Sequence, residues 1–195
     1  MLFRSAYLQP PNFIPSADDA VNYGAIGVTI GHEISHAFDD KGSQYDGDGK
    51  LNNWWSDQDR RIFDEKTKRL VDQYSKYEPV PGININGELT LGENIADLAG
   101  AKASFRAYKI SLKRNMSPLI DGLTGEQRFF IGSAQSDRVK FRKEIEAMRV
   151  ATDPHSPARF RIDGVIVNME EFHQAFDTKE GDKLFRDVED IIKIW

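Results

Sequence analysis

The sequence predicts a mainly α-helical fold with short β-strands, of the α+β class, in a single domain over residues 1–195. Three observations support this prediction. Apolar residues recur with helical spacing in several long stretches, whereas only two short segments suggest strands. Clusters of proline and glycine separate these stretches. The chain has 195 residues, of which 39% are hydrophobic, and this is enough apolar material for one core.

The first element expected, after an irregular lead over residues 1–23, is a buried helix that ends near Phe38. Small and apolar residues fill positions 24–31, and the glycines among them allow close packing against neighbouring elements. Residues 39–50 are rich in aspartate and glycine, which favour turns. A surface loop is therefore expected to follow the buried helix.

Two long helices are predicted in the middle of the chain. Residues 54–77 have apolar side chains at helical spacing, with Ser56 as the N-cap. Prolines then break the chain, and residues 83–87 suggest a short strand or a turn. The second helix is expected from about Leu91 to about Arg114.

The last third of the chain is predicted to alternate short helices with a loop and one strand. Residues 126–135 and 138–149 have the spacing of helices. Prolines in segment 152–157 exclude a regular helix there. Residues 160–167 alternate enough for a short strand, and 169–176 resembles a final helix.

Composition excludes several classes of function. The net charge of −5 and the scattered basic residues argue against nucleic acid as a partner. The chain has no cysteine, so a metal ion would have to be held by imidazole and carboxylate groups. No apolar run approaches the roughly 20 residues that span a bilayer, and the N-terminus lacks the apolar core of a signal peptide. These features favour a cytoplasmic location.

The segment His32-Glu33-Ile34-Ser35-His36 carries the strongest chemical signal. Two histidines four residues apart share one face of a helix and can bind one cation together. Glu33 lies beside the first histidine, where it can take a proton from water as a general base. The alternative is a chance match on a surface helix. Apolar neighbours argue against it, because buried imidazoles need a polar partner: Ile26, Val28, Ile30, Ile34 and Phe38.

Glu93 is the candidate for a third metal ligand. Glu93 and Asp97 share one face of an otherwise apolar helix, where two carboxylates are costly unless both have partners. A metal ion could be the partner of Glu93, and the N–H of a ligand imidazole the partner of Asp97. The alternative is a solvated helix face. Asp39 could orient His36 in the same way, or could simply form the turn that ends the helix.

These motifs together resemble the neprilysin-like zinc endopeptidases, the M13 peptidase family. Its zinc motif matches 32–36, its glutamate motif matches 92–97, and its late histidine loop matches 155–157. The resemblance extends from about Phe3 to Trp195 and corresponds to the C-terminal catalytic portion of the family. The absence of cysteine indicates a bacterial-type member instead of a disulfide-rich animal ectodomain.

The resemblance implies a fold, a cofactor and site residues. The expected fold is a zincin domain of the gluzincin type, and the expected cofactor is one Zn²⁺ held by His32, His36 and Glu93. By resemblance, His155 donates to the oxyanion of the reaction intermediate and Arg161 binds a substrate carbonyl. The implied catalytic residues are Glu33, His155 and Asp97, with short peptides as substrates.

The sequence also departs from the family pattern. Family members are longer, with an N-terminal helical lobe and a substrate-binding strand that have no counterpart here. Ser136-Asp137 stands where an aromatic residue usually follows an Ala-Gln pair. Two hypotheses result: a zinc endopeptidase of short peptides, or an incomplete, non-catalytic zinc module that needs a missing lobe or partner chain. An exposed apolar surface would favour the second. A purely structural metal site would need a fourth protein ligand, which these motifs do not offer.

Overall fold

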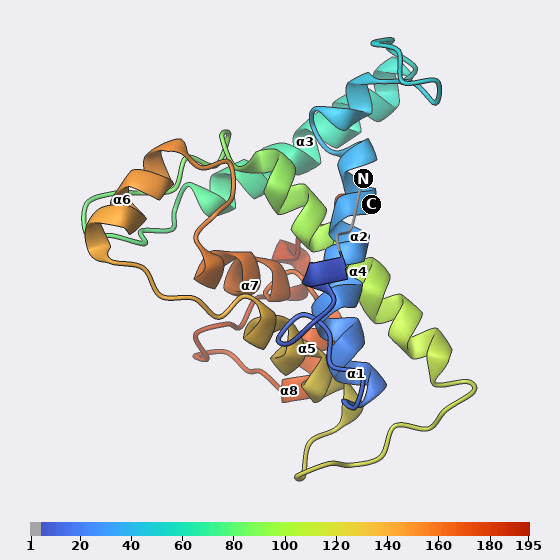
Figure 1. Cartoon of the computed structure of the whole chain (residues 1–195). Helices are drawn as coiled ribbons and strands as arrows, with labels where there is room; N and C mark the ends of the chain where they lie inside the picture. The colour runs from blue at the N-terminus through green and yellow to red at the C-terminus, as the bar shows by residue number, and fades with distance from the viewer. Residues whose placement is uncertain (1–4) are drawn as a thin grey trace.

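The structure is a computed structural model that describes residues 5–195, so the first four residues of the predicted lead lie outside it. Within that range the chain is mostly helical (Figure 1), as predicted. The α-helices are α1 (Asp19–Asn22), α2 (Val28–Ser35), α3 (Asp57–Tyr74), α4 (Leu91–Ser111), α5 (Gly125–Ser136), α6 (Lys143–Thr152), α7 (Ala158–Ile166) and α8 (Glu170–Phe176). Extended pairing in the described residues is limited to isolated bridges, which join Tyr45 to Leu51, Val80 to Ile83 and Ile120 to Leu123.

The short strands predicted from sequence are absent from residues 5–195. Segment 160–167 was expected as a strand, but it forms α7. Its buried residues include Phe160 and Gly164, which are four positions apart, the spacing of one helix face. Segment 83–87 is irregular apart from the bridge at Ile83.

The long helices agree with their predicted positions. Ser56 caps α3 by accepting a hydrogen bond from the backbone N–H of Asp59. Thr124 and Gln127 form a capping box at the start of α5. The helix expected from Arg138 begins later, at Lys143, after a loop.

Helix α2 continues a longer helical segment. A π-helical turn over Tyr23–Gly27 precedes it, and a 3₁₀ turn over His36–Phe38 follows. The segment crosses α4 so closely that the two backbones touch (Figure 1). A Cβ atom added to Gly100 of α4 would lie 2.8 Å from the Cα atom of His32, and one added to Gly31 would lie 2.8 Å from the Cα atom of Gly100. Only glycine fits at this crossing.

Replacing Gly100 with alanine is expected to lower the free energy of unfolding by about 1–3 kcal/mol, because the new methyl group would push α2 away from α4. Urea denaturation of the two proteins measures this difference. Gly47→Ala is the matched control, since nothing lies within 4 Å of a Cβ atom there. Equal denaturation midpoints for the two variants would contradict the close crossing.

The core lies on the inner side of α4 and is rich in aromatic residues. Tyr74, Tyr108 and Phe129 are almost fully buried, and Phe105 packs edge-on against Phe129.

The outer side of α2 differs from the prediction of a helix buried on most sides. Three apolar residues of this segment form an exposed row, here called the outer stripe. They are Ile30, Ile34 and Phe38, with exposed fractions of 41%, 59% and 47%.

No helix in the described part of the chain combines the length and the apolar character needed to cross a membrane.

Candidate metal centre

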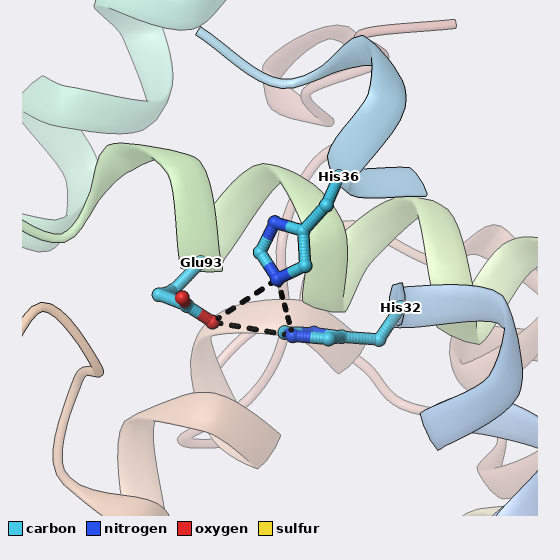
Figure 2. Close-up of side chains that lie close together, drawn as sticks. All are labelled: His32, His36 and Glu93. Carbon is cyan, nitrogen blue, oxygen red and sulfur yellow. Dashed lines mark hydrogen bonds and ion pairs between the residues drawn. The ribbon is translucent and has the colours of Figure 1, made fainter. Parts of the chain in front are cut away.

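Two crossing helical segments bring three metal-binding side chains together. His32 comes from α2, His36 from the turn that follows it, and Glu93 from the first turn of α4 (Figure 2). The Nε2 atoms of the two histidines are 3.0 Å apart. Glu93 Oε2 lies 3.2 Å from His32 Nε2 and 3.7 Å from His36 Nε2. The three residues form a group that could hold one metal ion.

The hydrogen bonds of the two imidazoles show what this group needs. His32 Nδ1 lies 2.7 Å from Asp97 Oδ1, and His36 Nδ1 lies 2.7 Å from Asp39 Oδ2. An ionised carboxylate only accepts, so each Nδ1 carries a proton and Nε2 is the nitrogen of each ring that can bind a cation once it has lost its own proton. The two Nε2 atoms converge on Glu93 Oε2, a buried atom without a hydrogen-bond partner in the described residues. A cation at the point of convergence would satisfy all three atoms.

The spacing of the donor atoms also suits a tetrahedral metal ion. Ligands at about 2.0–2.1 Å from such an ion lie roughly 3.3 Å from one another. The observed separations of 3.0, 3.2 and 3.7 Å are close to that value. Three protein ligands leave the fourth position of a tetrahedron open, as in catalytic sites.

Glu33 follows His32 on α2 and is half-buried. Its carboxylate has no hydrogen bond or ion pair to any other residue between 5 and 195. It is therefore free to accept a proton from a water molecule beside the metal ligands.

Asp97 links His32 to Arg161. Arg161 donates from Nε to Asp97 Oδ2 at 2.9 Å and from Nη2 to Asp97 Oδ1 at 2.6 Å. Burial acts to raise the pKa of Asp97, but the Arg161 guanidinium and His32 together outweigh burial and lower it. Asp97 thus stays ionised and keeps accepting from His32. Arg161 is the residue predicted to bind substrate. Its Nε and Nη2 atoms donate to Asp97, so Nη1 is the nitrogen that can donate to another partner.

Asp39 is both a turn residue and a partner of His36. Its Oδ2 atom accepts from His36, while its Oδ1 atom accepts from the backbone N–H groups of Lys41 and Gly42 at 2.8 and 2.6 Å. The two roles considered for Asp39 are therefore compatible, because each uses a different oxygen.

His155 also faces the metal centre, with its Nε2 atom 3.2 Å from Glu93 Oε2. Asp153 Oδ1 accepts from both the backbone N–H and the Nδ1–H of His155, each at 2.9 Å. With Nδ1 protonated in this way, Nε2 can donate only when the imidazole is cationic. The nearby Glu93 carboxylate raises the pKa of His155 against the opposing effect of burial, and this higher pKa favours the cation.

Two residues that hold this loop were not predicted from the sequence. Asp153 precedes His155 by two positions, a spacing that is typical of a carboxylate accepting from the backbone of its own turn. Asn94, next to Glu93, accepts a 2.8 Å hydrogen bond from the hydroxyl of Ser156, next to His155. This buried bond ties the histidine loop to α4, and no sequence signal indicated it.

The site thus combines a His-Glu-x-x-His segment with a glutamate from a second helix, in an arrangement that could hold one metal ion. Comparison with known proteins identifies the family. The model of "Peptidase family M13" matches residues 1–192, and the chain belongs to that family.

Similar proteins were found in animals and bacteria. The chain is 45% identical to Neprilysin-11 of Caenorhabditis elegans, over 89% of this chain and 21% of that protein. It is 43% identical to human endothelin-converting enzyme 1, over 93% of this chain and 24% of that protein. The inhibitor complex of the Mycobacterium tuberculosis zinc metalloprotease Zmp1 superimposes with a TM-score of 0.95 at 51% identity, over 98% of this chain and 30% of that one. The chain therefore spans about a quarter of the length of the curated relatives it matches.

Proposed function

We propose that this chain carries the zinc-binding catalytic site of a gluzincin-type endopeptidase that hydrolyses short peptides. One observation carries the proposal: the Nε2 atoms of two imidazoles, oriented by Asp97 and Asp39, converge on the buried and unsatisfied Glu93 Oε2 atom. Membership of family M13 supports it, as does the likeness to a zinc metalloprotease.

Each side chain has a role that follows from its position. His32, His36 and Glu93 would hold the zinc ion, which supplies Lewis acidity that polarises the scissile carbonyl and acidifies water. Glu33 accepts the proton of the attacking water and passes it to the leaving amine. His155 donates from Nε2 to the oxyanion that develops on the carbonyl oxygen. Arg161 Nη1 donates to a second carbonyl of the peptide.

A second candidate is a zinc-binding module that is inactive until another lobe or chain completes it. The outer stripe on α2 favours this candidate, because three large apolar side chains lie exposed in one row beside the metal ligands. In that case zinc binding is expected without hydrolysis.

Hydrolysis of a mixed short-peptide library by the zinc-loaded protein tests both candidates, with Glu33→Gln run beside it. Cleavage by the parent alone supports the endopeptidase. If both proteins hold one zinc ion and neither cleaves, the incomplete module is the correct description. Failure of the parent to bind zinc would overturn both.

The role of His155 predicts a specific kinetic result. His155→Phe is expected to lower kcat by about 10²–10³-fold, as removal of an oxyanion donor does, with unchanged zinc content. Asp153→Asn is expected to lower kcat less, since His155 stays in place with a weaker acceptor at Nδ1. Steady-state kinetics and metal analysis measure these effects. A kcat for His155→Phe equal to that of the parent would remove His155 from the reaction.

Zinc affinity is expected to rise with pH between 6 and 8. Burial alone would lower the pKa of His32, but its hydrogen bond with Asp97 and the adjacent Glu93 carboxylate raise it to about 9. A proton must therefore leave His32 before Nε2 can bind zinc, and affinity increases as that proton becomes easier to remove. Calorimetric titration in buffers of different ionisation enthalpy counts the protons released. Zinc binding without proton release at pH 7 would contradict this prediction.

A further inference from the structure

A cavity of about 290 Å³ lies beside the metal centre. Its wall includes His155, whose Nε2 atom lies 3.2 Å from Glu93 Oε2, and Arg161, which is bonded to Asp97. A peptide with its scissile bond at the metal centre would thus have a neighbouring side chain at this cavity. The inference below rests on the proposed function, because the proposed reaction places the peptide there.

The basic groups on the inner wall are already paired. Arg161 forms its two hydrogen bonds with Asp97, and Arg149 Nη2 lies 2.6 Å from Asp153 Oδ2. The Arg149 guanidinium also lies over the ring of Phe141, 4.6 Å from its centroid. Each arginine thus has a closer carboxylate partner than Asp137 or Glu146.

The acidic groups on the wall are unpaired. Asp137 and Glu146 are half-buried, and neither carboxylate has a hydrogen bond or ion pair with any residue of the described range 5–195. The third arginine of the wall, Arg138, is exposed, and His155 can also carry a positive charge. Burial raises the pKa of Asp137 and Asp97 acts in the same direction, whereas Arg161 and His155 lower it. The cavity therefore presents two carboxylates that form no hydrogen bond or ion pair of their own with the described residues.

We infer that this cavity binds the side chain of the substrate residue next to the scissile bond and selects lysine or arginine there. A cationic side chain would pair with Asp137 and replace the interactions with water that its half-buried carboxylate has lost. An apolar side chain would leave that carboxylate unpaired, and an acidic one would be repelled. Asp137 is thereby a specificity-determining residue, separate from the metal ligands and the groups that move protons.

Peptide binding to the zinc-loaded Glu33→Gln variant tests this without needing turnover. The probes are fluorescent short peptides that differ at a single position, which holds lysine, norleucine or glutamate and is moved along the peptide in turn. At one position, lysine is expected to bind about tenfold more tightly than norleucine, and glutamate most weakly. Adding Asp137→Asn should abolish this preference, and Asp137→Lys should reverse it. Glu144→Gln, an exposed carboxylate outside the cavity wall, is the matched control and should leave it unchanged.

Two results would overturn the inference. One is equal affinity for lysine and norleucine at every position, or no binding of any peptide. The other is a lysine preference that persists in Asp137→Asn, which would show attraction to the acidic protein as a whole. The proposed function fails differently: a parent that does not cleave the peptides that Glu33→Gln binds selectively would refute the peptidase and leave the binding preference standing.

Discussion

Replacing Glu33 with glutamine is expected to lower kcat by up to about 10⁴-fold while the protein keeps its zinc ion. Glutamine has nearly the same size, but its amide cannot take a proton from water. Zinc should stay, since the metal-binding group consists of His32, His36 and Glu93. Peptide hydrolysis assays and metal analysis on the same preparations measure both quantities.

The control for this variant is Glu88→Gln, an exposed carboxylate in the loop before α4. It should behave like the parent in both assays. Hydrolysis by Glu33→Gln at the rate of the parent would exclude Glu33 as the general base. Loss of zinc from Glu33→Gln would instead place Glu33 among the ligands.

The zinc affinity of two variants should distinguish the role of Glu93 from that of Asp97. Asp97→Asn is expected to weaken zinc binding by about 10–100-fold, because Asp97 only orients the His32 ring. Glu93→Ala should weaken it by more than about 100-fold, since it removes one of three ligand atoms. Competition with a chromogenic chelator gives both affinities.

Asparagine is preferable to alanine at position 97, because its amide oxygen can still accept a hydrogen bond from the partly buried Arg161, whereas alanine would leave that guanidinium without a partner. Circular dichroism melts of both variants show whether the fold survives. Zinc affinity of Glu93→Ala equal to that of the parent would refute Glu93 as a ligand.

Local signals explain what could be predicted from the sequence. The helical character of most segments follows from apolar spacing, and Ser56 is a local N-cap whose hydrogen bond lies within its own turn. The meeting of His32 and His36 depends only on the geometry of one helical turn. Glu93 was predicted from its place beside Asp97 on an apolar helix face, and the family resemblance added His155, whose Nε2 atom lies 3.2 Å from Glu93 Oε2.

Long-range packing explains what could not be predicted. Segment 160–167 has few residues and mixed polarity, so its packing against other elements decides that it is α7 and not a strand. The bond between Asn94 and Ser156 joins residues that are 62 positions apart. The exposure of the outer stripe likewise could not be predicted from the sequence, because Ile30 and Ile34 are apolar residues of the kind that usually lies in a core.

The close crossing of α2 and α4 has a consequence for the size of the ion that the centre accepts. His32 and Glu93 come from different helices, and the distance between those helices is fixed by contact between backbones at Gly31 and Gly100. A calcium ion prefers six to eight ligands at about 2.3–2.6 Å, so it would have to push the helices apart. Main-chain atoms in contact cannot yield as long side chains do. The spacing of the two helices would thus determine which ionic radius fits the centre. Gly31 and Gly100 allow this spacing, because each has a hydrogen atom in place of a side chain.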